Sequence, residues 1–71
     1  MDKEAVQIGF GKKLRKLREE KGFIQEELAY KANLHFTYIG QAERGLRNLT
    51  LHSIAKIAKA LRVSGGDLLP F

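Results

Sequence analysis

The stretch Gln25-Glu-Glu-Leu-Ala-Tyr-Lys-Ala-Asn-Leu-His-Phe-Thr-Tyr-Ile-Gly-Gln-Ala-Glu-Arg44 predicts two short helices joined by a tight turn. Asn33 marks the turn, because asparagine adopts the left-handed backbone conformation more readily than most residues. Gly45 is expected to end the second helix. Apolar residues recur at helical spacing on both sides of the turn: Leu28, Ala29 and Ala32 before it, Ile39 and Ala42 after it. Two helices with so short a connection form a helix-turn-helix over residues 25–44.

Residues 2–21 are predicted to form a helix before this motif. Asp2 can cap its beginning. Gly9 and Gly11 weaken its interior, so either the helix begins firmly only near Ile8, or the glycines allow another segment to approach closely. Its inward side chains follow spacings of four, four and three: Val6, Phe10, Leu14 and Leu17.

Another amphipathic helix is predicted after the motif. Thr50 can cap it, and Val63 and Ser64 are expected to end it. Gly65–Leu69 can add one last turn. The inward side chains of this helix share an apolar character and a helical spacing: Leu51, Ile54, Ile57, Ala58 and Leu61. The expected fold class is therefore all-α, a compact bundle of four to five short helices.

Length and composition narrow the possibilities further. The 71 residues predict one domain over positions 1–71, near the lower size limit for an isolated core. The absence of cysteine excludes disulfides and thiolate metal sites, and His35 and His52 are not spaced as a metal-binding pair. We expect no metal, cofactor or small-molecule ligand. No apolar run reaches transmembrane length, and no signal-peptide pattern begins the chain, which favours a cytoplasmic protein without a membrane partner.

The charge balance favours a polyanionic partner. Thirteen Lys and Arg residues face eight Asp and Glu residues, a formal net charge of +5, and the pI is about 9.8. A small basic protein attracts nucleic acid. The alternative is that the charge only keeps the protein soluble.

The order of these parts resembles the Cro/repressor-type (XRE-like) helix-turn-helix regulators over residues from about 10 to 69. The resemblance rests on Gln25-Glu-Glu-Leu-Ala, Tyr38-Ile39, Glu43-Arg44-Gly45, Ala60-Leu61-Arg62-Val63-Ser64 and Asp67-Leu68-Leu69. Within that family the chain is most similar to the controller proteins of restriction–modification systems, through residues 33–39, 43–44 and 47–50. It departs from the family at Ile24, where Thr or Ser is usual, and at Phe36, where controllers tend to carry a basic residue.

The resemblance implies a λ-repressor-like domain that binds double-stranded DNA and regulates transcription. Its second motif helix would lie in the major groove with its first turn at the base edges. The side chains expected to contact bases are His35, Phe36, Thr37, Tyr38 and Gln41. Thr37 can bond a base or contact a thymine methyl, and Gln41 can pair with adenine. The alternatives are core packing for Phe36 and Tyr38, and an ordinary solvated residue for Gln41.

Other residues are expected to position the protein on the sugar–phosphate backbone, which carries no sequence information. Gln25 begins a helix whose amides can bind a phosphate, and Arg44, Arg47 and Asn48 follow the recognition helix. The alternative for Arg47 is that it is a surface residue without a DNA contact.

The resemblance also implies a partly buried ion pair between Arg18 and Glu43 that orients the recognition helix; the alternative is two exposed charges worth almost nothing.

Two other classes of protein fit this sequence less well than a DNA-binding regulator. An enzyme is disfavoured, because the sequence has no Ser-His-Asp set or phosphate loop and too little chain to enclose a pocket. A protein-interaction or antitoxin-type module is more credible, since the same fold can bind partners through its apolar end. We assign that end, Leu68, Leu69 and Phe71, to a homodimer instead.

Overall fold

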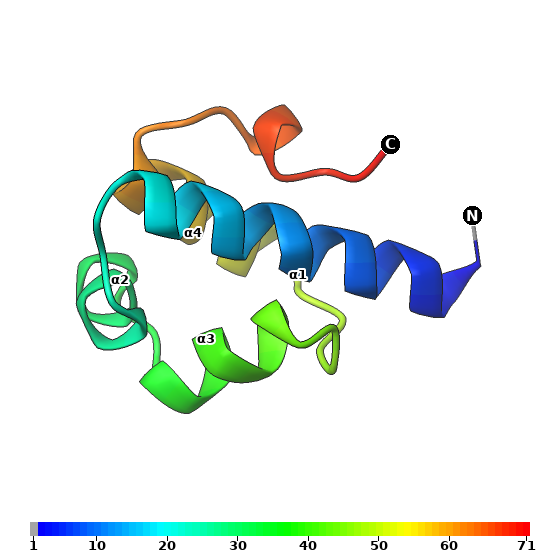
Figure 1. Ribbon diagram of the computed structural model, residues 1–71, viewed down its shortest axis with the longest axis horizontal. Coiled ribbons are helices and arrows are strands. Elements are labelled where there is room, and N and C mark those ends of the chain that lie inside the picture. Colours follow the sequence, from blue (N-terminus) through cyan, green and yellow to red (C-terminus); the bar gives the residue numbers. More distant parts are fainter. Residues whose placement is uncertain (1) are drawn as a thin grey trace.

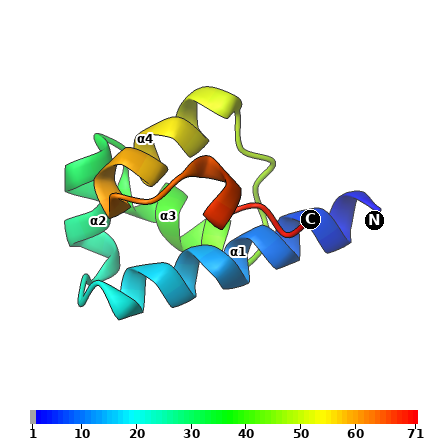
Figure 2. The same ribbon diagram turned by 90° about the horizontal axis from the view of Figure 1, so that it is seen from above.

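The computed structural model describes residues 2–71 as an all-helical chain, as predicted. Its elements are α1 (Lys3–Glu20), α2 (Gln25–Ala32), α3 (Phe36–Glu43), α4 (Leu51–Leu61) and the short 3-10 helix η1 (Gly65–Asp67). In Figure 1, α1 runs along the molecule, with α2 and α3 on one side of it and α4 behind. Figure 2 shows α2 and α3 between α1 and α4, and the last residues returning along α1. None of the helices in residues 2–71 is long and apolar enough to cross a membrane.

The helix α1 begins at Lys3, not near Ile8. Asp2 Oδ1 accepts the N–H of Ala5 at 2.7 Å, which confirms the predicted cap. The close approach of another segment, which the sequence left open as an alternative, occurs at Gly11. A Cβ placed on Gly11 would lie 2.5 Å from the carbonyl oxygens of Ala42 and Glu43. The missing side chain therefore lets the backbone at the end of α3 lie directly against α1.

The turn between α2 and α3 has the predicted chemistry. Asn33 has φ 56° and ψ 48°, the left-handed conformation. The N–H of Leu34 then donates to the carbonyl of Ala29 at 2.9 Å, which closes the helix end. Gly45 also has a positive φ, 77°, at the end of α3. These two left-handed residues fix the direction in which α3 leaves α2 and the chain leaves α3.

The helix α4 begins as predicted but ends earlier. Thr50 Oγ1 accepts the N–H of Ser53 at 3.1 Å. The helix ends at Leu61, because Arg62 adopts φ 59° and ψ 43°. The N–H of Val63 then donates to the carbonyl of Ala58 at 3.0 Å. An arginine in the left-handed conformation is uncommon, so the residue type at position 62 did not predict this helix end.

The core joins all four α-helices and the segment after η1. Its members are buried apolar residues: Phe10, Leu14, Leu28, Ala29, Ala32, Ile39, Ala42, Ile57, Ala58, Leu61 and Leu68. Leu51 was predicted to point inward, and this was wrong, because its side chain is 86% exposed. Side chains of a helix point toward its N-terminus, so a residue in the first position overhangs the preceding loop instead of the core.

Candidate nucleic-acid interface

The first turn of α3 is presented to solvent. His35, Phe36 and Thr37 are exposed, and Phe36 retains half of its accessible surface. The rings of His35 and Phe36 stack with centroids 5.0 Å apart. His35 Nδ1 accepts the N–H of Thr37 at 3.1 Å, so this histidine also caps α3. The structure therefore places Phe36 outside the core, on an exposed platform made of two rings and one hydroxyl.

A hollow of about 470 Å³ lies beside this platform, where α1, the beginning of α2 and α3 meet. Two exposed arginines, Arg15 on α1 and Arg44 after α3, line it. Arg15 was not among the predicted site residues. The sequence could have indicated this position, because Arg15 lies three residues before Arg18 and therefore on the same side of the helix. The other lining residues come from all three helices: Arg18, Gln25, Phe36, Thr37, Gly40 and Glu43.

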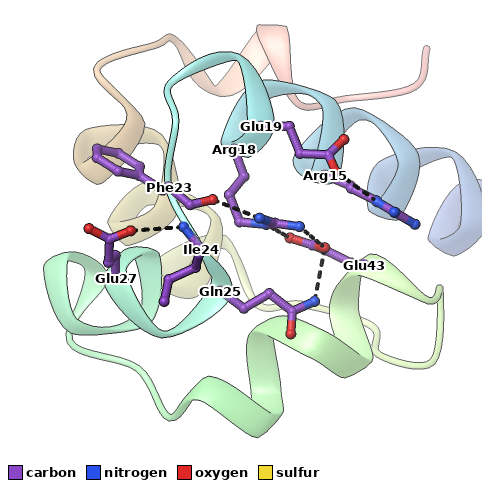
Figure 3. Close-up of polar contacts among 8 residues, drawn as sticks. All are labelled: Arg15, Arg18, Glu19, Phe23, Ile24, Gln25, Glu27 and Glu43. Carbon is purple, nitrogen blue, oxygen red and sulfur yellow. Dashed lines mark hydrogen bonds and ion pairs between the residues drawn. The ribbon is translucent and has the colours of Figure 1, made fainter.

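Arg18 and Glu43 form an ion pair that joins α1 to the end of α3 (Figure 3). The Arg18 Nη2 donates to Glu43 Oε1 at 3.0 Å, and Nε donates to Oε2. Only 11% of the Arg18 side chain and 4% of the Glu43 side chain are exposed. Arg18 Nη1 also donates to the carbonyl of Phe23 at 2.7 Å. The hydrogen bond to Glu43 raises the pKa of Arg18, so this guanidinium keeps its positive charge.

Gln25 is directed into this network. Its Nε2 donates to Glu43 Oε1 at 3.1 Å, the same oxygen that Arg18 uses (Figure 3). A Cβ on Gly40 would lie 3.3 Å from Gln25 Oε1, so the amide packs on a bare stretch of α3. Ile24, before it, has no side-chain acceptor for the amides that follow, and its own N–H donates to Glu27 Oε1 at 3.0 Å. The first-turn amides of α2 thus lack a side-chain cap, while the Gln25 side chain holds α2 to α3.

The segment after α3 is exposed and basic. Arg44, Arg47 and Asn48 are all on the surface. Arg47 Nε donates to Gln41 Oε1 at 2.8 Å, and its guanidinium carbon lies 4.8 Å from the centre of the Tyr38 ring. Tyr38 is partly buried, and its hydroxyl lies 3.5 Å from Ser53 Oγ on α4. Gln41 and Arg47, predicted to act separately, are therefore in direct contact.

Comparison with protein families matches residues 14–68 to the family described as helix-turn-helix. The chain belongs to the helix-turn-helix family. The match covers the α2–α3 motif, η1 and every core residue except Phe10, which agrees with the resemblance predicted from the sequence.

This helix-turn-helix protein is similar to several controller proteins. It is 48% identical over 67 residues to the control protein C.BamHI of Bacillus amyloliquefaciens, covering 93% of this chain and 83% of that protein. The restriction-modification controller protein C.AhdI from Aeromonas hydrophila superposes with a TM-score of 0.86 at 44% identity, over 87% of this chain and 94% of that chain. The controller protein C.Esp1396I, solved as a tetramer with its natural 35 base-pair operator, has a TM-score of 0.78 at 48% identity, over 82% and 76% of the two chains.

The apolar end of the helix-turn-helix protein differs in part from expectation. Leu68 was assigned to a dimer contact, but its side chain is fully buried in this chain's own core and is not available to a partner. Leu69 is partly buried against a small hollow that Ile54 also lines. Phe71 is 80% exposed, and Leu51 is 86% exposed. Leu51, which the sequence placed in the core, is thus as exposed as Phe71.

Proposed function

We propose that this chain is a sequence-specific double-stranded DNA-binding transcriptional regulator of the restriction–modification controller kind, and that it acts as a homodimer. One observation carries the proposal: the exposed first turn of α3 stands beside a hollow with Arg15 and Arg44 on its wall. A protruding helix end with two arginines beside it fits a major groove, which is bordered by phosphates. The operator complex of the related C.Esp1396I supports this assignment.

In this arrangement the platform of α3 faces the base edges. The Thr37 hydroxyl bonds a base or its methyl contacts a thymine methyl, and the exposed ring of Phe36 contacts thymine methyls. His35 lies beside them. The uncapped amides at the beginning of α2 donate to a phosphate. Gln25 contributes by holding α2 against α3, and Arg15, Arg44 and Asn48 contact the backbone of the same DNA.

Binding to duplex DNA should weaken with added salt, because each phosphate contact releases counterions. The logarithm of the affinity should fall linearly with the logarithm of the salt concentration, by about 0.9 for each contact. Arg15→Ala and Arg44→Ala should each reduce that slope by about one unit. The measurement is a fluorescence anisotropy titration of the full chain at several salt concentrations.

A charge-matched control is Lys59→Ala, on the last turn of α4, which should leave the slope unchanged. Affinity without salt dependence would contradict the DNA-binding proposal. A protein-interaction module, the second candidate, would then be favoured by the exposed Leu51 and Phe71.

Leu51→Asp and Phe71→Asp should each weaken self-association. A homodimer interface is isologous, so one substitution removes two buried apolar side chains and adds two charges. Burial of one such side chain is worth about 1.5–3 kcal/mol, so the dimer dissociation constant should rise by tenfold or more. Analytical ultracentrifugation measures it. Both positions are exposed in the protomer, and the variants should therefore fold.

The matched control is Tyr30→Asp, because Tyr30 is 88% exposed and lies on α2. This change should leave the dimer intact. A wild-type chain that stays monomeric, or a Tyr30→Asp variant that dissociates as readily as Leu51→Asp, would contradict the proposal that Leu51 and Phe71 contact the partner protomer.

A further inference from the structure

Phe36 places an apolar ring at the exposed end of α3. It is the first residue of this helix, and its side chain keeps 50% of its accessible surface. Side chains of a helix point toward its N-terminus, so the ring lies ahead of the first turn. The ring of His35 stacks against it, with centroids 5.0 Å apart and planes inclined by 22°. His35 is itself fixed by the hydrogen bond from the N–H of Thr37. Phe36 is therefore exposed and already supported before any partner binds.

The ring has one apolar counterpart among the base edges of the major groove. Guanine, adenine and cytosine present hydrogen-bond donors and acceptors there, whereas thymine also presents the methyl group on its C5 carbon. A phenyl ring placed against a donor or an acceptor displaces water without replacing the hydrogen bond, which is unfavourable. Phe36 is therefore suited to a pyrimidine that carries a C5 methyl group.

The same methyl group occurs on 5-methylcytosine. Methylation adds it to the same ring carbon, so it lies at the same place in the groove as the thymine methyl. The two bases differ at C4, where thymine has an oxygen that accepts and cytosine has an amino group that donates. Thr37 lines the same hollow as Phe36, and its hydroxyl can donate to the oxygen or accept from the amino group. Phe36 and Thr37 together thus fit both methylated pyrimidines, while unmethylated cytosine lacks the group that the ring contacts.

We propose that Phe36 makes DNA binding by this chain respond to C5 methylation, so that each half-site takes thymine or 5-methylcytosine at the ring in preference to unmethylated cytosine. The proposal rests on the DNA-binding function proposed above. The reaction that supplies the modified base is methyl transfer to cytosine C5. A site with cytosine at this position is therefore bound more tightly after methylation than before.

The first part of the test removes single methyl groups from the DNA. A duplex preferred by the wild-type chain is selected from a random pool. Each thymine of a half-site is then replaced in turn by deoxyuridine, which removes the C5 methyl group and keeps the base pair. At one position this should weaken binding by about fourfold, the worth of one buried methyl group, and by about 15-fold when both half-sites are changed.

The second part adds the methyl group. A C·G pair replaces the T·A pair at the same position, and duplexes with cytosine and with 5-methylcytosine are compared. Methylation should raise the affinity of the wild-type chain by about fourfold for each half-site. Phe36→Ala should bind the two duplexes equally, and it should also bind the thymine and deoxyuridine duplexes equally. Because Phe36 is half exposed, this variant should fold, which circular dichroism checks.

The matched control is Tyr30→Ala, which removes an exposed aromatic ring from α2 and should keep the full response to methylation. Phe36 carries no charge, so Phe36→Ala should also keep the salt dependence of the wild-type chain. An unchanged salt dependence separates the loss of methyl recognition from a general loss of DNA binding.

Three outcomes would overturn the proposal. A wild-type chain that selects a common sequence but does not respond to deoxyuridine or 5-methylcytosine would keep the DNA-binding function and lose methyl recognition. A response that survives in Phe36→Ala and disappears in Thr37→Ala would assign the methyl contact to Thr37. A wild-type chain that enriches no common sequence would remove the proposed function itself, and methyl recognition with it.

Discussion

Replacing Glu43 by alanine is expected to lower the free energy of unfolding by about 3 kcal/mol. The Arg18 side chain is only 11% exposed in the intact pair, and the change removes its counter-ion. Removing one partner of a buried pair costs this much because the remaining charge is poorly solvated. Gln25 Nε2 would lose its acceptor as well. The total stability of a 71-residue chain is only about 4–10 kcal/mol, so a large share would be lost.

Chemical denaturation followed by circular dichroism measures this loss. The matched control is Glu19→Ala, which breaks the Arg15–Glu19 pair on α1. That pair is well exposed, at 64% and 55%, and should be worth no more than about 0.5 kcal/mol. The double variant Arg18→Met/Glu43→Leu removes both charges and should recover much of the stability. Equal effects of Glu43→Ala and Glu19→Ala would show that burial of the Arg18–Glu43 pair carries little energy.

Gly11→Ala is expected to destabilise the protein by about 3 kcal/mol and to lower Tm by more than 10 °C. The added Cβ would lie 2.5 Å from two backbone oxygens at the end of α3, and backbone cannot move aside as a flexible side chain can. The direction of the change in stability is informative, because replacing glycine by alanine in an unobstructed helix stabilises the helix by up to about 1 kcal/mol. The clash must therefore outweigh a favourable helix propensity.

Two other glycines serve as controls for this effect. A Cβ on Gly65 would meet nothing within 4 Å, so Gly65→Ala should change stability little. A Cβ on Gly22 would also meet nothing, but its φ of 76° should cost about 1 kcal/mol. The Tm values of the three variants compare the cost of a steric clash at Gly11 with the cost of backbone strain at Gly22, with Gly65 as the reference. A Gly11→Ala variant as stable as wild type would mean that α1 and α3 do not approach as closely as described.

The features that the sequence predicted correctly are local ones. The caps at Asp2 and Thr50 and the left-handed turns at Asn33 and Gly45 depend on residues within a few positions of each other. Helical periodicity is also local, and it located α1 to α4. These signals were sufficient for the fold class and for the placement of the recognition helix.

The features that the sequence did not predict depend on packing between distant segments. The exposure of Leu51 and the burial of Leu68 follow from where the chain passes before α4 and after η1. The inward direction of Gln25 depends on Glu43, 18 residues away. The contact between Gln41 and Arg47 depends on the turn at Gly45. Residue type gave each of these side chains a plausible role, but only the tertiary arrangement decides which partner it meets.

The histidine cap of α3 has a consequence for the chemistry of the exposed platform. Because His35 Nδ1 accepts the N–H of Thr37, that nitrogen carries no proton. The neutral ring must then hold its proton on Nε2, so the cap selects one tautomer. Nε2 is the nitrogen left to face a partner, and in this tautomer it can only donate. As long as the cap is intact, a base edge opposite His35 must supply an acceptor, such as a purine N7, and an amino group there would be rejected.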